Sequence, residues 1–335
     1  MKYQLFHMEN QGVLARGQVD RIGMRGAVLS HTRQDGHSVK MAGEIIDHQN
    51  AIEYILAILV SRNHGVMEDR EEIDAVGHRV VHGGEKYKDS VLITEEVTKH
   101  IEDLIDLAPL HNPNNLKGIY ACQQLLQDVP MVAVFDTAFH ADMPDYAYLY
   151  GLPYILYKRY GVRRYGFHGT SHYYVARRAI DLMEMNIEDS RIITCHLGNG
   201  CSISAVKGGT SLDTSMGFTP VEGLLMGTRS GDIDPALVLH LLSKEELTVG
   251  DMNTLLNKHS GLQGVSGVSS DMREILEAVE DGNERAHIAL DIFTYRLKKY
   301  IGSYTAVLEG VDAIVFTGGI GENSPRVRAD SLAGL

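Results

Sequence analysis

The sequence predicts an α/β protein with layered sheets, organised as two domains. Runs of β-branched and apolar residues alternate along the chain with segments whose apolar residues recur every three or four positions, and this order favours sheets covered by helices. A chain of 335 residues is long enough to form two sizeable cores. Two of the apolar runs, 192–195 and 311–316, lead directly into glycine-rich turns, and this repeat hints at two related halves.

The first half of the chain is expected to contain strands and helices in turn. The predicted elements are a strand at 3–6, a helix at 42–60, a strand at 73–81, a helix at 94–107 and a short buried strand at 131–135. Apolar residues at helical spacing identify the first helix, and Thr94, followed by two glutamates, is typical of the start of the second. Prolines and a glycine between 144 and 153 then interrupt the periodic pattern, so we expect domains at 1–140 and 141–335.

The second half is expected to continue the alternation. The predicted elements are a helix at 171–183, strands at 192–195 and 201–206, a long helix at 285–308 and a buried strand at 311–316. The helix at 285–308 has the clearest signal, because its apolar residues, from Ala289 to Leu308, share one stripe. Both glycine turns therefore follow buried strands.

Composition and charge exclude several classes of function. Hydrophobic residues make up 44% and charged residues 22% of the chain, as in ordinary globular proteins. The net charge of −13 argues against non-specific DNA or RNA binding, which requires a basic face. No apolar run is long enough to span a bilayer, and no secretory signal follows Met1. Cys122, Cys195 and Cys201 form no paired motif, so we expect reduced thiols in a cytoplasmic protein.

The two glycine turns are expected to bind an anion. The first spans 192–201 with its strand, and the second spans 313–323. Glycines let main-chain N–H groups approach a phosphate closely, and each turn contains an asparagine, Asn199 or Asn323. The alternative for either turn alone is a tight connection between two elements. We interpret the pair as two sides of one nucleotide cleft, although the P-loop and dinucleotide motifs are absent, which excludes an ordinary dehydrogenase.

Charged residues in short segments are further candidates. Arg79 stands inside an apolar strand, so it is expected to be buried against an anion, either a structural ion pair or a ligand. Asp136 directly follows a strand, where α/β sheets present functional groups, and the alternative is a helix N-cap. Arg229 lies between glycines, as in many anion sites, and the alternative is a solvated loop.

Histidines form another group of candidates. His168 and His172 are four residues apart, a spacing that permits metal ligation. The H-E-x-x-H motif and an evident third ligand are absent, so zinc is not expected. His111 stands between two prolines, and the alternative to a site is a rigid turn.

Taken together, these segments resemble the acetate kinase family. The matching segments are 77–84, 108–113, 134–140, 165–172, 196–200, 227–232 and 318–323, in the family's order and spacing over nearly the whole chain. Propionate and butyrate kinases share much of this series. The resemblance implies the two-domain fold of actin, sugar kinases and heat-shock-protein ATPases, which is ribonuclease H-like, with the nucleotide between the domains. It also implies phosphoryl transfer between ATP and a short carboxylate such as acetate, giving acetyl phosphate.

The resemblance implies a role for each site residue. Arg79 is implied to bind the carboxylate, Asp136 to be the catalytic acid, and His168 and Arg229 to stabilise the transition state. The implied nucleotide ligands are Lys2, His196, Leu197, Gly198, Asn199, Gly200, Asp271, Met272, Arg273, Gly319, Ile320, Gly321, Glu322 and Asn323. The implied apolar pocket for the acyl group consists of Val81, Leu110, Phe167 and Pro220. Mg²⁺ or Mn²⁺ is implied to accompany ATP, and the family suggests a homodimer.

A carboxylate substrate is already ionised near neutral pH and needs no strong base. We therefore expect Asp136 to orient Arg229 or the metal rather than to remove a proton.

Two segments of the family pattern have no counterpart in this sequence. The family begins with a strand and an Asn-x-Gly-Ser-Ser-Ser loop before its Lys-Tyr pair, whereas this chain begins with Met1-Lys2-Tyr3. The family also continues past the position of Leu335, with a metal-ligating glutamate. We therefore expect a chain that is incomplete at both ends, without identifiable metal ligands and with weak or no turnover. The interpretations left open are an acetate kinase, a propionate or butyrate kinase, and a nucleotide-binding module without catalysis.

Overall fold

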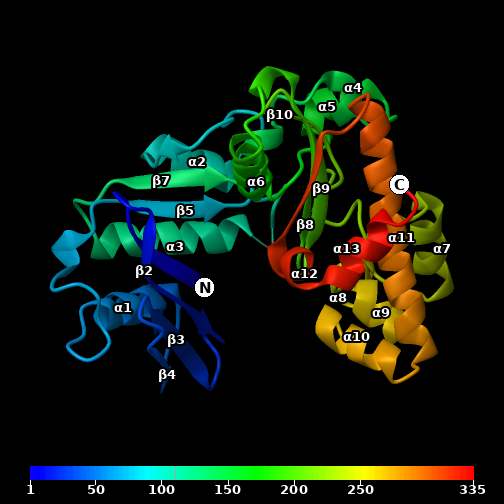
Figure 1. Ribbon diagram of the computed structural model, residues 1–335. Helices are drawn as coiled ribbons and strands as arrows, with labels where there is room; N and C mark the ends of the chain where they lie inside the picture. The colour runs from blue at the N-terminus through cyan, green and yellow to red at the C-terminus, as the bar shows by residue number, and fades with distance from the viewer. Residues whose placement is uncertain (110) are drawn as a thin grey trace. The chain divides into compact units, whose positions relative to one another are not determined.

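The structure is a computed structural model, and it describes residues 1–109 and 111–335. The chain forms two compact units, which can be followed by colour in Figure 1. Residues 1–80 and 90–134 make up the first unit, and residues 81–89 and 135–335 make up the second. The predicted α/β class is confirmed, and the predicted domain boundary after residue 140 stays a prediction.

The first unit begins with an antiparallel meander. Its strands pair in chain order: β1 (Lys2–His7), β2 (Gly12–Asp20), β3 (Ala27–Arg33) and β4 (Ser38–Gly43). Alternate residues such as Ala15, Val19 and Leu29 are buried on one face, in a cluster shared with α1 (His48–Leu59). The predicted strand at 3–6 is confirmed. The helix predicted from residue 42 begins only after its N-cap, Asp47, because β4 occupies the residues before it.

A three-stranded sheet completes the first unit. Its order is β5 (Val76–Val80), β7 (Met131–Phe135), β6 (Val91–Leu92), and its helices are α2 (Glu95–Asp103) and α3 (Asn112–Leu125). Thr94 caps α2 by accepting a hydrogen bond from the Val97 N–H, as predicted. Helices α1 and α3 share an apolar cluster with β7. Helix α3 begins directly after His111, where the sequence suggests only a rigid turn.

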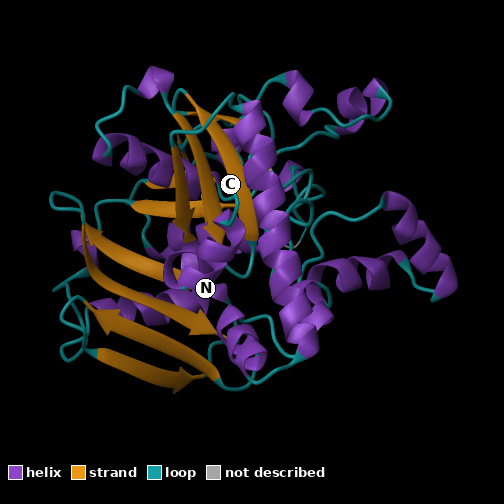
Figure 2. Ribbon diagram, turned by 45° about the vertical axis from the view of Figure 1, so that its right-hand side comes forward, coloured by secondary structure: helices purple, strands orange, loops and turns teal. Residues whose placement is uncertain are grey.

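A four-stranded sheet forms the centre of the second unit. Its order is β10 (Thr210–Thr214), β9 (Cys201–Lys207), β8 (Arg191–Leu197), β11 (Ala313–Thr317). Strand β8 is antiparallel to β9 and parallel to β11. Helix α6 (Gly169–Leu182) packs on one face with Ile192 and Val206, and helix α11 (Glu284–Val307) packs on the other with Ile193 and Cys195. Figures 1 and 2 show α11 running beside these strands.

The predicted strands and long helix of this unit are confirmed. Asn283 caps α11 by accepting from the Ala286 N–H, and the predicted stripe from Ala289 to Leu308 supplies its buried face. The remaining helices of the chain are α4 (Asp145–Tyr148), α5 (Tyr154–Tyr160), α7 (Pro235–Lys244), α8 (Val249–Lys258), α9 (Gly261–Ser266), α10 (Met272–Glu280), α12 (Gly318–Asn323), α13 (Pro325–Leu332) and 3-10 turns at Arg70–Glu72, Ala138–His140 and Ile187–Asp189. Among the helices of residues 1–109 and 111–335, none has the length and apolar character needed to cross a membrane.

Candidate active site

The two glycine turns lie side by side at one edge of the sheet in the second unit. Strands β8 and β11 are parallel, with Thr317 opposite His196, so both turns follow the carboxyl ends of neighbouring strands. Gly318 has a φ of +78°, and a Cβ on it would lie 2.6 Å from the Leu197 carbonyl oxygen. This close approach requires glycine. The turns therefore belong to one edge of one sheet, where α/β proteins place ligands.

The two turns differ in conformation. In the first, the Gly198 N–H donates to the Gly200 carbonyl (3.1 Å). In the second, the strand passes directly into the helical backbone of α12 after Thr317. Asn323 lies at the end of that helix, and its side-chain amide donates to the Gly319 carbonyl (2.9 Å). The prediction that Asn323 stands inside a tight turn is therefore wrong.

Gly227 allows the loop that carries Arg229 to lie against the first glycine turn. The Gly227 N–H donates to the Asn199 carbonyl (2.9 Å). A Cβ on Gly227 would lie 2.0 Å from the Asn199 side-chain oxygen and 3.1 Å from the Ser270 carbonyl oxygen. The Met226 N–H donates to the Arg229 carbonyl (3.2 Å) and closes the loop. Three segments that the sequence identifies separately thus meet through close main-chain contacts.

Gly200 lies close to the two residues predicted to stabilise the transition state. A Cβ on Gly200 would lie 3.3 Å from Arg229 Nη1, 3.5 Å from His168 Cε1 and 3.6 Å from His168 Nε2. The guanidinium and the imidazole therefore face one small volume beside the first turn. The structure brings these two predicted residues together.

Arg229 is a half-buried cation. Its Nη1 contacts the Pro220 carbonyl oxygen (3.4 Å) and the Met226 Sδ (4.0 Å). Burial lowers the pKa of this guanidinium, and the thiol of Cys201 acts in the opposite direction. Within residues 1–109 and 111–335, no carboxylate forms an ion pair with Arg229, so an orienting ion pair with Asp136 is not observed. A desolvated guanidinium of this kind gains strongly from a bound anion.

His168 has an unusual main-chain conformation that its neighbours support. It is the N-cap residue of α6, with φ 58° and ψ 22°, in the left-handed region, where a residue other than glycine is strained. The next residue, Gly169, donates its N–H to the Asp136 carbonyl (2.8 Å). A Cβ on Gly169 would lie only 2.4 Å from that oxygen. The main chain of buried Asp136 therefore lies immediately beside the His168 turn.

Buried His140 holds the carbonyl that precedes His168. Its Nε2 donates to the Phe167 carbonyl (3.1 Å), and its Nδ1 pairs with the Ser211 hydroxyl (2.7 Å). Because a carbonyl only accepts, His140 carries its proton on Nε2. Burial lowers the pKa of His140 to about 4, so its ring is neutral near pH 7. The sequence places His140 in a matching segment but assigns it no role.

The sheet face under α6 is polar at the end that carries the site. Thr194 and His196 on β8 pair in register with Ser204 and Ser202 on β9. His168 Nδ1 pairs with the Ser202 hydroxyl (2.8 Å), and the His168 ring stacks on His196 with centroids 4.2 Å apart. Thr194 and Ser202 are not among the predicted site residues. The signal for Ser202 is serine at every second position of a buried strand, 201–205, and the sequence carries no comparable signal for Thr194.

The residues predicted to bind the nucleotide differ in the burial of their side chains. The side chains of Leu197 and Met272 are buried in the core shared with α11, and Ile320 packs against that core. Leu197 is 0% and Met272 only 3% exposed, so neither side chain is accessible to a ligand. Asp271 and Arg273 pair with each other at 2.6 Å, and the hydrogen bonds from Arg273 lower the pKa of the Asp271 carboxyl to about 2.

Among residues 1–109 and 111–335, two predicted site residues belong to the first unit. Arg79 in β5 and Lys2 in β1 are both exposed. The prediction that Arg79 is buried inside its strand is wrong, because residues alternate along β5 and Arg79 points away from the face of buried Val80. The placement of Arg79 and Lys2 at the same site as His168 and Arg229 stays a prediction.

The predicted acyl pocket is described for three of its four residues. Val81 and Phe167 are buried in the core of the second unit, and the Pro220 carbonyl accepts from Arg229 Nη1. Leu110 lies outside the described residues. That these residues contact an acyl group stays a prediction.

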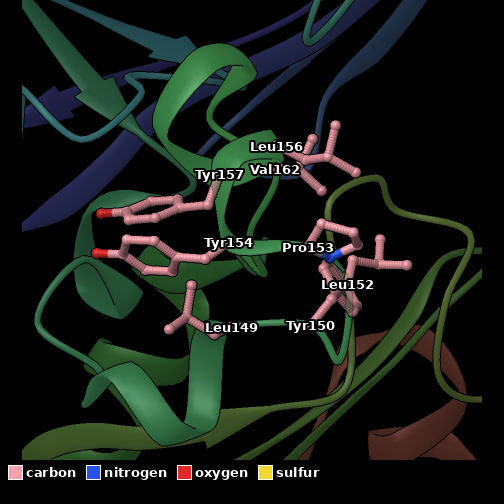
Figure 3. Close-up of a pocket in the computed structure, with 8 residues that line it drawn as sticks. All are labelled: Leu149, Tyr150, Leu152, Pro153, Tyr154, Leu156, Tyr157 and Val162. Atoms are coloured by element: carbon pink, nitrogen blue, oxygen red, sulfur yellow. The ribbon is translucent and has the colours of Figure 1, made fainter.

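A surface pocket in the second unit is formed by other residues. Figure 3 shows it lined by Tyr150, Pro153, Tyr154 and Tyr157 with apolar neighbours, and the Tyr154 and Tyr157 hydroxyls point the same way. None of the residues predicted for the site lines this pocket. We therefore keep the candidate site at the glycine turns.

Potential metal ligands are dispersed. In the part of the chain that the structure describes, no group of three or more His, Cys, Asp or Glu side chains is arranged to hold a metal ion. His172, four residues from His168, pairs through Nδ1 with the Thr194 hydroxyl and through Nε2 with the Ser202 hydroxyl (2.7 Å each). Both of its nitrogens are therefore occupied by hydrogen bonds.

Comparisons with known proteins find similar sequences and similar solved structures. A family model described as the acetokinase family matches residues 1–335. The chain is 55% identical to an acetate kinase from Azobacteroides pseudotrichonymphae, covering 100% of this chain and 84% of that protein. It is similar to the crystal structure of Porphyromonas gingivalis acetate kinase, with a TM-score of 0.96 and 50% identity. The match covers 100% of this chain and 84% of that one. A propionate kinase structure from Francisella tularensis matches with a TM-score of 0.93, 40% identity, and coverage of 98% and 83%.

Proposed function

This chain belongs to the acetokinase family, and from that premise we propose that it catalyses reversible phosphoryl transfer between ATP and acetate, giving acetyl phosphate and ADP. It is an ATP-dependent carboxylate kinase in this proposal. The observation that carries the proposal is the shared volume beside Gly200, which Arg229 and His168 both face. A half-buried guanidinium without a carboxylate partner among the described residues is suited to an anionic group that arrives with the substrate.

Catalysis of phosphoryl transfer depends mainly on positioning the reactants and stabilising the charge of the transition state. Charge on the transferred phosphoryl group is spread over its three equatorial oxygens. Arg229 donates charge-assisted hydrogen bonds to these oxygens, and His168 donates from Nε2. The hydrogen bond to Ser202 and the stack on His196 hold the His168 ring in place before the substrate arrives, which is the preorganisation that such catalysis needs.

Acetate is ionised near neutral pH, so the attacking oxygen needs no strong base. We therefore assign Asp136, the predicted catalytic acid, an orienting role rather than proton removal. Arg79 binds the carboxylate of acetate or acetyl phosphate in this proposal. Val81, Leu110, Phe167 and Pro220 surround the methyl group.

The nucleotide is proposed to lie along the two glycine turns. Residues 196–200 and 319–323 contact the phosphates in this proposal, with Asp271–Arg273 and Lys2 as further contacts. Mg²⁺ or Mn²⁺ accompanies ATP. The dispersed ligands of this chain fit an ion carried mostly by phosphate oxygens and water, with one or two carboxylates such as Asp136. When bound, the ion neutralises charge between the phosphates.

The proposal is tested by trapping the product. Purified protein with ATP, Mg²⁺ and acetate should form acetyl hydroxamate when hydroxylamine is present, and ADP should appear in equal amount. Calorimetric binding of ADP without hydroxamate would instead identify a nucleotide-binding module without catalysis, and the kinase assignment would fail.

A second candidate function is a propionate or butyrate kinase, favoured by the 40% identity to a propionate kinase structure. One methylene in an apolar pocket changes discrimination by only about 1–3 kcal/mol. The ratio of kcat/KM for acetate, propionate and butyrate decides between these substrates. A ratio that rises with acyl length would replace acetate as the proposed substrate.

We also propose that the chain acts as a homodimer in the cytoplasm, as the family resemblance implies. Analytical ultracentrifugation of the purified protein tests the dimer. A monomer at micromolar concentration would contradict it.

A further inference from the structure

A chain of hydrogen bonds under α6 connects His168 to a buried threonine. His168 Nδ1 pairs with the Ser202 hydroxyl (2.8 Å), Ser202 pairs with His172 Nε2 (2.7 Å), and His172 Nδ1 pairs with the Thr194 hydroxyl (2.7 Å). Thr194, His172 and Ser202 are each 0% exposed. Water is therefore excluded from the chain, and its protons must be shared among these four side chains.

His172 fixes the number of protons in this chain. Burial lowers the pKa of His172 well below its ordinary value, and the neighbouring histidines act in the same direction. The His172 ring is therefore neutral near pH 7 and carries one N–H. If Thr194 donates to Nδ1, then Nε2 carries the proton and donates to Ser202. If Thr194 accepts instead, the donor and acceptor of every hydrogen bond in the series are exchanged.

Thr194 decides the direction. Over residues 1–109 and 111–335, the hydrogen-bond partner of the Thr194 hydroxyl is His172 Nδ1 alone. If Thr194 accepted, its own hydroxyl proton would be left buried without an acceptor, which is unfavourable. The favoured direction therefore begins with Thr194 as donor. Ser202 then accepts from His172, and its single hydroxyl proton goes to His168 Nδ1.

We propose that Thr194, His172 and Ser202 are positioning residues that keep the proton of His168 on Nε2. This is the nitrogen that faces Gly200 and Arg229. His168 then presents an N–H donor, and not a lone pair, to the volume where an anion binds. None of the three residues touches the substrate. The importance of this tautomer for phosphoryl transfer rests on the proposed function, whereas the tautomer itself is a property of the free protein.

The first test is the tautomer of His168 in the ligand-free protein. The protein is labelled with [¹⁵N]histidine, and the His168 signals are assigned from the spectrum of His168→Gln. We expect Nδ1 to resonate as a non-protonated nitrogen and Nε2 as a protonated one near neutral pH. A protonated Nδ1, whether in the other neutral tautomer or in the imidazolium, would overturn the proposal. This measurement needs no turnover, so it stays decisive if the kinase assignment fails.

The second test removes the donor at the start of the chain. Thr194→Val keeps the shape but deletes the hydroxyl, so no hydroxyl proton holds His172 in the tautomer with its proton on Nε2. We expect the His168 spectrum to show both tautomers and kcat to fall about tenfold, the effect of about 1.4 kcal/mol, with KM for ATP and acetate within about twofold. Thr194→Ser should restore the wild-type spectrum and kcat.

Ser204→Ala is the control for the loss of a buried hydroxyl on the same face. Ser204 pairs with the Asp213 carbonyl (2.8 Å) and the Ser211 hydroxyl (3.2 Å), and with none of Thr194, His172, Ser202 and His168. This variant should leave the His168 spectrum unchanged. A Thr194→Val protein that has lost stability but keeps the wild-type spectrum and kcat would show a purely structural role and overturn the proposal.

Discussion

The two faces of the central sheet in the second unit carry different tasks. On the face toward α11, Ile193, Cys195, Ile203 and Ala205 are fully buried in one apolar cluster. On the face toward α6, the same two strands present Thr194, His196, Ser202 and Ser204 near the site. Adjacent residues of a strand point to opposite faces of the sheet. The alternation of apolar and polar residues along these two strands therefore forms both faces. The apolar face supplies stability, and the polar face supplies a preorganised site.

Replacement of Arg229 should have the largest effect on kcat. Arg229→Ala removes the guanidinium that faces Gly200, so we expect kcat for acetyl phosphate formation to fall about 10³-fold. ADP affinity by calorimetry should change little, because the proposed nucleotide contacts are made by other segments. The exposed Arg177 of α6 provides the control, and Arg177→Ala should keep wild-type kcat. Equal losses in the two variants would place the chemistry elsewhere.

Truncation on the apolar face should affect stability instead. Ile203 is 0% exposed, and Ile203→Ala should lower the free energy of unfolding by about 2–5 kcal/mol. Ser204→Ala, one position along on the polar face, should cost about 1 kcal/mol. Urea unfolding of both variants gives the comparison. A larger loss at Ser204 would contradict the division of tasks between the faces.

A methyl group at Gly200 should obstruct the site without unfolding the protein. The added Cβ would lie 3.3 Å from Arg229 Nη1, in the space assigned to the anion. We expect kcat/KM to fall about 10- to 100-fold and the melting temperature to stay close to that of the wild type. Gly302→Ala on α11 meets nothing within 4 Å and should stabilise the helix by up to about 1 kcal/mol. Unchanged activity in Gly200→Ala would remove the anion from this volume.

The buried histidine under the site should give a smaller, pH-dependent effect. The pKa of His140 is about 4 in the folded chain, against 6.5 for an ordinary histidine. Below pH 6.5 the unfolded chain binds a proton that the folded chain does not, so the free energy of unfolding decreases as pH falls from about 6.5 to about 4. The slope from this residue is at most about 1.4 kcal/mol per pH unit.

His140→Gln should remove that part of the slope, measured by urea unfolding at several pH values. Exposed His240→Gln is the matched control. The same slope in His140→Gln and in the wild type would assign the pH dependence to other groups.

The elements with strong local signals are predictable from the sequence, and those set by tertiary pairing are not. The stripe of α11 and the apolar runs of β8 and β11 identify themselves by periodicity. The strands β2, β3 and β4 lack long apolar runs, because one side of the meander is exposed along β2 and β4 and half-buried along β3. Helix α3 begins at a proline-flanked histidine that also suits a turn.

The site was predictable where residue type alone carries the chemistry. Arg229 and the glycines of 198–200 point to an anion site by residue type, whereas the role of His168 comes from the family resemblance. Thr194, Ser202 and His172 become partners only through the register of β8 on β9 and the packing of α6. Arg79 misled because one arginine in an apolar strand suggests burial, whereas alternation along β5 exposes it.

The central claim is that Arg229 and His168 act on one anion beside Gly200, and a double-mutant cycle tests it most directly. The kcat/KM for acetyl phosphate formation is measured for the wild type, Arg229→Ala, His168→Ala and the double variant. Groups that share one transferred phosphoryl should lose less together than the sum of their separate losses, with a coupling of at least about 1 kcal/mol. Losses that add to within about 0.5 kcal/mol would mean that the two side chains act independently, and the account would be contradicted.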